Sequence, residues 1–403
     1  MPNYLDPKKI AVVIPSYIGG GAETITDIIF PGLMKHYNYS VELISGDMNE
    51  HTRPRAQQLG YKVTDLSEYG PQINKPQTKE AILHALKNSD AKHIVFAVVF
   101  PDDAEHFRSE LPGRNIIFHL HSLPLWQATD RVMANRKAAQ ALGTASSYIS
   151  YRLKALKEKW FKVYTRRYAK RYRKMYDYVD QIIVLTDSYR RQLNKIMGHK
   201  ADNDPNSRIS TLYNPFDPAP LAVLANTPKR KEILYVGRLN CVDKGVDHLI
   251  RAWNIICRDY PDWTLKIVGE GPDKGYLEWL VDALSTTSVE FCGYSSDPAS
   301  HYATASILCM TSNFEGWGMA LIEAMAAGVV PLAVDCSDGV HEVLDEGRGI
   351  LVEPGSDAKI AKGLRHLIEH PEELANRRRL YPIFLKKFDV LNTISTFNQI
   401  LQK

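Results

Sequence analysis

EILYVGRLNCVDKGVDHLIRAWNIICRDYPDWTLKIV, residues 232–268, is the stretch of sequence that decides the fold. Residues 232–236 are largely apolar and end at a glycine, as a buried strand does. Residues 245–260 are typical of a helix, and residues 264–268 of a second strand. A strand, a helix and another strand in this order predict a parallel sheet whose crossovers are helical.

The N-terminal half has the same alternation. Strands are predicted at 10–15, 40–45, 94–100, 115–119 and 181–185, and in the C-terminal half also at 289–292, 307–311 and 330–334. A helix over 22–37 follows a glycine-rich loop, and the proline-rich stretch after 214 suits a connector between domains. We therefore predict an α/β chain with two doubly wound domains, 1–213 and 214–385. The segment 386–403 contains a predicted helix, 391–401, that packs back on the first domain.

Composition excludes several classes of protein. Of 403 residues, 44% are hydrophobic and 24% are charged, which excludes disordered, collagen-like and coiled-coil chains. The longest apolar run, 94–100, is too short to span a bilayer, and the N-terminus is interpreted as a first strand and not as a signal peptide. The five cysteines are odd in number and form no C-x-x-C pair, which favours a reducing cytoplasm over disulfides or a zinc site.

Charge is unevenly distributed along the chain. Residues 1–213 hold 31 Lys and Arg against 21 Asp and Glu, whereas residues 214–403 hold 19 against 25. Residues 152–174 alone carry eleven of the cations and one acid, Glu158. Apolar and aromatic residues recur there every three or four positions, so 151–176 is predicted to be a basic helix. It either packs its aromatic stripe and solvates its basic face, or it contacts an anionic membrane surface or a lipid diphosphate.

The stretch 312–328, SNFEGWGMALIEAMAAG, contains two glutamates, Glu315 and Glu323, separated by seven residues. Gly316 and Gly318 stand at the entry to a predicted helix that Gly328 ends. Glycines let backbone N–H groups approach a ligand, and a helix N-terminus favours an anion. Carboxylates can accept hydrogen bonds from sugar hydroxyls. The alternative is a loop with two solvated glutamates.

Two cations follow the strand at 232–236, namely Arg238 and Lys244. Ligands of doubly wound domains bind beyond the carboxyl ends of the strands, so these cations could balance a diphosphate. They could equally be ordinary surface cations.

In the N-terminal half, the stretch 16–23, SYIGGGAE, is either a ligand-binding or a purely structural glycine-rich turn. His119 and His121 end another strand. We expect their side chains to point to opposite faces, one toward the sheet and one toward a cleft.

Together these stretches resemble retaining glycosyltransferase family 4, whose members have the GT-B fold, with two Rossmann-like domains facing each other across a cleft. The residues that carry the resemblance are Gly20 to Glu23, Gly237 to Leu239, Lys244 and Gly245, Gly269 to Gly271, Glu315 to Gly318 with Glu323, Gly349 to Val352, and Pro354 with Gly355. Trp317 stands where many relatives have Phe.

The resemblance implies a site for a nucleotide-diphosphate sugar. Arg238 and Lys244 would stabilise the departing diphosphate in place of a metal ion. Glu323 would hold the ribose, while Glu315 and the N–H groups from Gly316 to Met319 would hold the donor sugar. The further implied residues are His121 near the reacting carbon, Gly20, Gly21 and Gly237 against the donor, Trp317 and Gly318 in the helix entry, and Gly293 with Tyr294 beside the base. His119 would be structural.

The resemblance also implies an activity and its partners. The expected enzyme transfers a sugar with retention from a UDP- or GDP-sugar to a glycan or polyprenyl-diphosphate-linked acceptor. The product would be a surface polysaccharide, such as lipopolysaccharide or capsule. We expect no metal, no cofactor and no nucleic acid, and a cytoplasmic protein at the inner face of the plasma membrane. The alternatives are a nucleic-acid-binding protein that uses the basic helix, which leaves the C-terminal stretches unexplained, and a GT-B nucleotide-sugar epimerase.

Overall fold

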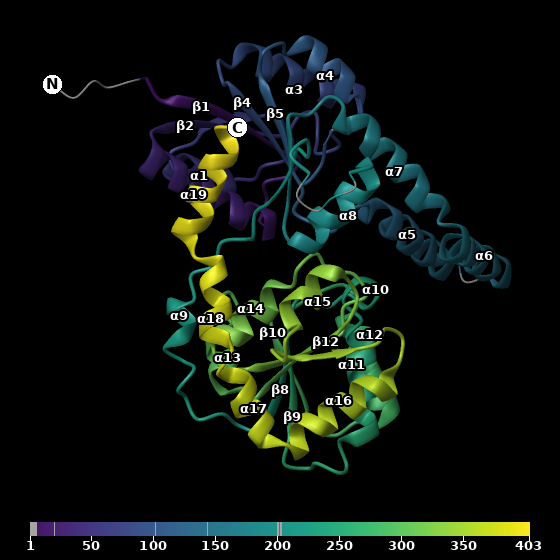
Figure 1. Cartoon of the computed structure of the whole chain (residues 1–403). Coiled ribbons are helices and arrows are strands. Elements are labelled where there is room, and N and C mark those ends of the chain that lie inside the picture. Colours follow the sequence, from purple (N-terminus) through teal and green to yellow (C-terminus); the bar gives the residue numbers. More distant parts are fainter. Residues whose placement is uncertain (1–5, 20, 101, 143, 200, 202–203) are drawn as a thin grey trace. The chain divides into compact units, whose positions relative to one another are not determined.

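The computed structural model describes residues 6–19, 21–100, 102–142, 144–199, 201 and 204–403. They form two compact units, each built on its own parallel sheet (Figure 1). The first, unit 1, comprises residues up to Arg131, Arg152–Phe216 and Phe388–Lys403. The second, unit 2, comprises Val132–Tyr151 and Asp217–Lys387.

Unit 1 contains a seven-stranded sheet in the order β3-β2-β1-β4-β5-β6-β7, with every neighbouring pair parallel. Its strands are β1 (Lys8–Ile14), β2 (Tyr39–Ser45), β3 (Lys62–Asp65), β4 (His93–Ala97), β5 (Asn115–His119), β6 (Gln181–Val184) and β7 (Ile209–Thr211). The central strands are buried on both faces because helices cover the two sides of the sheet. Five of the strands were predicted. β3 and β7 were not predicted, because they are short and largely half-buried.

The helices of unit 1 include the C-terminal one, α19. They are α1 (Gly21–Tyr37), α2 (Thr52–Gln58), α3 (Pro76–Asn88), α4 (Ala104–Glu110), α7 (Val163–Tyr176), α8 (Asp187–Met197) and α19 (Val390–Leu401), with α5 (Trp126–Leu142) and α6 (Ala145–Phe161) partly in this unit. The α19 helix packs on α1, where the rings of Phe30 and Phe397 meet edge to face at 5.5 Å. Tyr39 Oη also donates to Asn398 Oδ1 at 3.1 Å. The chain's last helix thus belongs to the core of unit 1.

Unit 2 contains a six-stranded parallel sheet in the order β10-β9-β8-β11-β12-β13. Its strands are β8 (Glu232–Val236), β9 (Thr264–Val268), β10 (Val289–Gly293), β11 (Ile307–Met310), β12 (Val330–Val334) and β13 (Ile350–Val352). Its helices are α9 (Ala219–Ala222), α10 (Cys241–Lys244), α11 (Val246–Ile256), α12 (Lys274–Leu284), α13 (Ala299–Thr304), α14 (Met319–Ala326), α15 (Asp338–Leu344), α16 (Asp357–Glu369), α17 (Pro371–Arg378) and α18 (Tyr381–Leu385). This strand order is that of a Rossmann-like domain.

The predicted basic helix over 151–176 is two helices. α6 ends at Phe161 and α7 begins at Val163, because Lys162 between them has the left-handed backbone conformation, with φ of 51°. The apolar stripe predicted for one helix is therefore divided between two, with different surroundings in each.

Candidate functional site

The candidate site of unit 2 lies where the strand order reverses. The chain runs from β8 outward to β9 and β10, then returns to pair β11 with the other edge of β8. In doubly wound sheets, ligands bind beyond the carboxyl ends of the strands at such a reversal. The connections that follow β8 and β11 carry Lys244, at the end of the short helix α10, and Glu315.

Backbone and side-chain hydrogen bonds join these two loops. Asn313 N donates to Asp243 O at 2.9 Å, and Thr311 Oγ1 donates to Gly245 O at 2.8 Å. Gly245 has φ of 58°, and a Cβ there would lie 2.3 Å from Thr311 O, so only glycine allows this close approach. The loop after β8 is therefore held against the loop after β11.

The result is an ion pair between two residues that the sequence analysis proposed separately. Lys244 Nζ lies 2.5 Å from Glu315 Oε2, and the side chains are 26% and 20% exposed. They are half-buried, so their charges are screened less than those of a surface pair, yet a ligand can still reach them. The structure thus brings Lys244 and Glu315 together at the strand-order reversal.

Electrostatic effects on nearby groups show what else lies near this pair. Burial raises the pKa of Tyr235, Glu315 raises it further, and Arg238 partly offsets the rise. Burial also raises the pKa of Cys336, just after β12, to about 12, with a further contribution from Glu315. Arg238 is exposed, and its carbonyl accepts a hydrogen bond from Tyr235 Oη at 3.0 Å. Arg238 and Glu315 therefore both lie within electrostatic reach of Tyr235.

Glu323 lies inside α14 and has a buried partner that the sequence analysis missed. Tyr302, on α13, donates from Oη to Glu323 Oε2 at 2.8 Å. Burial raises the pKa of Glu323, while this hydrogen bond opposes the rise. Nothing local in the sequence signals the pairing, since the two residues come from separate helices.

The entry to α14 is formed by the glycine-rich segment. Gly318 is the N-cap residue with φ of 80°, and Met319 is the first helical residue. The Trp317 ring is only 3% exposed and belongs to the interior, so its side chain does not offer a surface to a ligand. Gly316, next to Glu315, is half-buried. As predicted, the helix ends just before Gly328, whose φ is 71°.

A neighbouring part of the same sheet edge contains the other predicted donor contacts of unit 2. Gly237 N donates to Val268 O at 3.0 Å, and Gly269 N donates to Gly293 O at 2.7 Å. A Cβ on Gly269 would lie 1.9 Å from Gly237 O, so this position requires glycine. Tyr294, next to Gly293, is 75% exposed. The ends of β8, β9 and β10 are therefore closely joined, and Tyr294 is accessible beside them.

In unit 1, the prediction that His119 and His121 point to opposite faces was wrong. Their ring centroids are 3.9 Å apart. His119 ends β5 and His121 follows two residues later, and residues two apart in an extended chain share a face. Burial lowers the pKa of His121 to about 4, and both of its ring nitrogens are buried without a hydrogen-bond partner among the described residues. Burial lowers the pKa of His119 too, and its ring stacks on Phe397. His121 is thus held as neutral imidazole.

The glycine-rich turn of unit 1 is described only in part, since Gly20 lies outside the described residues. Gly21 begins α1, and no heavy atom lies within 4 Å of a Cβ built there. Tyr17 and Asp27, on either side of this turn, are buried, and Tyr17 Oη donates to Asp27 Oδ1 at 2.5 Å. Burial raises the pKa of Glu23, and the charge of Asp27 adds to the rise.

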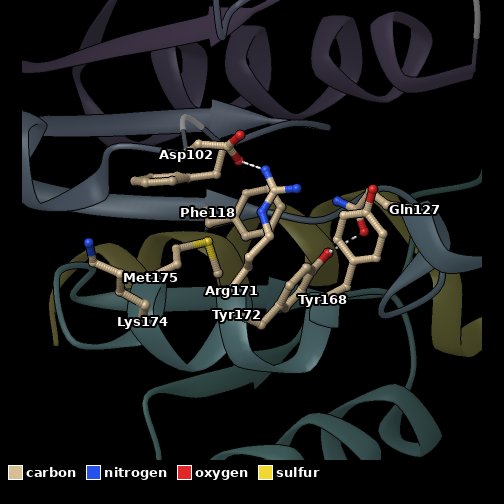
Figure 2. A pocket seen from close by; sticks show the side chains of 9 residues that line it. Asp102, Phe118, Gln127, Tyr168, Arg171, Tyr172, Lys174 and Met175 are labelled. Atoms are coloured by element: carbon tan, nitrogen blue, oxygen red, sulfur yellow. Dashed lines mark hydrogen bonds and ion pairs between the residues drawn. The ribbon is translucent and has the colours of Figure 1, made fainter. Parts of the chain in front are cut away.

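A small cavity in unit 1 lies between β5 and α7 (Figure 2). Phe118 and Tyr172 form its apolar wall, and Asp102 forms an ion pair with Arg171 across it. Its volume is about 80 Å³, whereas ligand pockets typically measure about 300–1,000 Å³. It can hold water but not a nucleotide sugar, and it contains none of the predicted site residues.

Two further findings concern the described part of the chain. Within it, His, Cys, Asp and Glu side chains do not gather in groups of three that could hold a metal ion. No helix there combines the length and apolar character needed to cross a bilayer.

Comparison with known proteins finds one family match within unit 2 and several related proteins. Residues 221–381 match the family described as glycosyl transferases group 1. An uncharacterized glycosyltransferase of Haemophilus influenzae is 36% identical over 179 residues, covering 43% of this chain and 50% of that protein. The N-acetylgalactosamine-N,N'-diacetylbacillosaminyl-diphospho-undecaprenol 4-alpha-N-acetylgalactosaminyltransferase of Campylobacter jejuni is 34% identical over 145 residues, covering 35% of this chain and 38% of that protein. The chain thus matches half or less of the length of these relatives.

Solved structures resemble the whole chain. The crystal structure of Anabaena HepE in complex with UDP has a TM-score of 0.70 at 16% identity, covering 98% of this chain and 99% of that one. The lipopolysaccharide outer core galactosyltransferase WaaB in its apo form has a TM-score of 0.65 at 18% identity, covering 98% and 99%. These similarities and the two Rossmann-like sheets confirm the predicted fold class. The chain therefore has the GT-B fold, and residues 221–381 of unit 2 are similar to the glycosyl transferases group 1 family.

Proposed function

We propose that the protein is a glycosyltransferase that takes its sugar from a nucleotide-diphosphate sugar bound at the strand-order reversal of unit 2. The observation that carries this proposal is the ion pair between Lys244 and Glu315, which joins the loops after β8 and β11. An ammonium group has three N–H donors, so Lys244 can hold Glu315 and a phosphate oxygen together. Anabaena HepE, which shares the fold, binds UDP.

The proposed chemistry is the stabilisation of a leaving group by fixed charge. As the bond between the sugar and the diphosphate breaks, negative charge grows on the diphosphate, and Lys244 and Arg238 would offset it. Backbone N–H groups at Gly318 and Met319, with Glu315, would hold the donor sugar. Glu323, positioned by Tyr302, would accept hydrogen bonds from the ribose. In this mechanism two cations take the place of a metal ion, and the anomeric configuration is retained.

Three more predicted donor or catalytic contacts belong to the same proposal. Tyr294 is exposed beside the β10 end and would flank the base together with Gly293. In unit 1, the glycine-rich turn at Gly21 would face the donor. His121, kept neutral by burial, would lie near the reacting carbon, where it can accept or donate a hydrogen bond.

The proposed acceptor is a glycan or a lipid-linked glycan used in surface polysaccharide synthesis. The name of the Campylobacter jejuni relative describes transfer to a diphospho-undecaprenol acceptor. An acceptor of this kind lies at the inner face of the membrane, so the enzyme would be cytoplasmic and peripheral. Eleven Lys and Arg within residues 152–174 supply the positive charge that such a location favours.

The test is a donor screen. Thermal-shift measurements with UDP-, GDP- and ADP-sugars in the presence of EDTA should give stabilisation selective for one base. NMR of the product from that donor should then show the donor's anomeric configuration preserved. Stabilisation only when a divalent metal is added would contradict the metal-free mechanism. Salt-dependent binding to nucleic acid without binding of any nucleotide sugar would reject the transferase.

A further inference from the structure

The helix α6 and its junction with α7 expose a set of large apolar side chains, which we call the apolar ridge. The ridge consists of Leu153, Leu156, Trp160, Phe161 and Val163. Trp160 is 74% exposed, and each of the other four is about half-exposed or more. Single apolar side chains are normal on a surface, but five large ones exposed within eleven consecutive residues are a local concentration that points to an interaction site.

The exposure stops at the junction with α7. Along α7 the stripe is half-buried at Tyr164 and Tyr168. It is buried against the sheet of unit 1 at Tyr172 and Met175, which are 4% and 8% exposed (Figure 2). The predicted alternatives for residues 151–176 therefore apply to different halves. The α7 half packs its aromatic stripe, and the α6 half leaves its own uncovered.

The junction itself is well defined. Glu158 Oε2 accepts from Tyr164 N at 2.5 Å, and its Oε1 accepts from Thr165 N at 3.0 Å. These bonds satisfy the free N–H groups at the start of α7, while Lys162 turns the backbone. Figure 1 shows α6 beyond the end of α7, away from the sheet of unit 1. Glu158, the single acidic residue of 152–174, is thus hydrogen-bonded to the first turn of α7.

The charge around the ridge identifies its occupant. At 3.6 residues per turn, Leu153, Leu156 and Trp160 share one face of α6, with exposed Lys157 on one side of it and exposed Lys159 on the other. A second copy of this chain would bring like charges together, whereas anionic lipid headgroups complement them. An amphipathic helix with Trp on its apolar face and Lys beside it suits the bilayer interface.

We propose that the apolar ridge inserts into the interface of an anionic membrane, with α6 lying in the plane of the surface. This contact deepens the proposed function, because it would hold the enzyme where a lipid-linked acceptor lies. It also restricts membrane insertion to α6 and the junction, since along α7 the stripe becomes half-buried and then, at Tyr172 and Met175, part of the core.

The experiment is flotation with vesicles of phosphatidylglycerol and phosphatidylethanolamine, compared with pure phosphatidylcholine. The double variant Trp160→Ser with Phe161→Ser should bind anionic vesicles at least tenfold more weakly. Both side chains are exposed, so folding is unaffected. The matched control is Trp279→Ser, which removes a Trp of unit 2 that is 60% exposed, and which should bind like the parent.

The charge requirement is tested separately. Lys157→Gln with Lys159→Gln should weaken binding to anionic vesicles about 25-fold, which corresponds to ~1 kcal/mol for each cation near an anionic surface. Lys157→Arg with Lys159→Arg preserves charge and should retain binding. Quenching of tryptophan fluorescence by brominated lipid should decrease in Trp160→Phe, which keeps the ridge apolar but removes its single tryptophan.

Unchanged flotation of the Trp160→Ser, Phe161→Ser variant would overturn the proposal. Self-association of the parent protein through the ridge, without flotation, would also overturn it. Sedimentation would show this if the parent associates and the Trp160→Ser, Phe161→Ser variant does not. The proposed membrane contact and the proposed transferase activity are tested separately when the Trp160→Ser, Phe161→Ser variant is also put through the donor screen. Retained nucleotide-sugar binding with unaltered flotation would reject the membrane contact alone, and failure of donor binding in the parent would reject the transferase alone.

Discussion

The ion pair of unit 2 gives the sharpest prediction, for the variant Lys244→Gln. The substitution removes the cation that lies 2.5 Å from Glu315 and keeps a side chain of similar length. Loss of one preorganised group that stabilises transition-state charge typically lowers kcat about 10²–10³-fold, or ~2.7–4 kcal/mol. We expect a decrease of that size in transfer from the donor found in the screen.

The effect of Lys244→Gln on stability should be much smaller. The pair is half-buried and keeps access to solvent, so its loss should lower the free energy of unfolding by about 1 kcal/mol. For a domain of this size, that corresponds to a Tm decrease of about 2–4 °C. Activity and stability are therefore predicted to separate.

The matched control is Lys266→Gln. Lys266, on β9, pairs with Glu232 at 3.0 Å at the start of β8, and its side chain is 18% exposed, more buried than Lys244. This variant should lose at least as much stability and keep kcat within a few-fold. Steady-state kinetics and thermal unfolding on both variants make the comparison. A tenfold or smaller loss of kcat for Lys244→Gln, or an equal loss in both variants, would refute the assignment of Lys244 to the leaving group.

Three further predictions concern other contacts. Tyr302→Phe removes the hydrogen bond to Glu323 and should weaken donor binding about tenfold, or ~1.4 kcal/mol, measured by calorimetry; unchanged affinity would separate Glu323 from the ribose. Gly269→Ala would place Cβ 1.9 Å from a backbone oxygen and should lower Tm by several degrees, whereas Gly275→Ala on α12 meets nothing within 4 Å and should not; equal Tm values would contradict the close approach. The pKa of His121 is about 4 in the folded protein, below the value of about 6.5 expected in the unfolded chain. As the pH falls below about 6.5, the unfolded chain therefore binds a proton at His121 before the folded protein does. The contribution of His121 to the free energy of unfolding is full above about pH 6.5 and decreases by about 2 kcal/mol at pH 5. Urea unfolding should show a smaller decrease between pH 7 and pH 5 in His121→Asn, and an identical pH dependence would contradict the buried neutral imidazole.

The sequence was sufficient for most of the fold. Strands β8, β9 and β12 have the predicted bounds, because each is a short apolar run between glycine or polar turns. The helix expected over 22–37 is found as α1 (Gly21–Tyr37), directly after the glycine-rich loop. Such features depend on residues within one turn or strand, so local pattern determines them.

The local sequence pattern did not predict features that depend on residues distant along the chain or on the backbone conformation of a single residue. The basic helix divides at Lys162, which lies within a helical pattern and is neither glycine nor proline. Burial of the α7 stripe and exposure of the α6 ridge follow from which of the two lies against the sheet. Both halves have the same spacing of apolar residues, so spacing could not distinguish them.

For the site, the sequence determined the chemistry and the tertiary structure determined the partners. Glycine-rich turns after strands, two cations and two glutamates are visible in the printed sequence. The pairing of Lys244 with Glu315, and of Tyr302 with Glu323, exists only because β11 lies beside β8 and α13 beside α14. Strand order is fixed by the packing of the whole sheet, whereas hydrophobic periodicity reports only on neighbours along the chain.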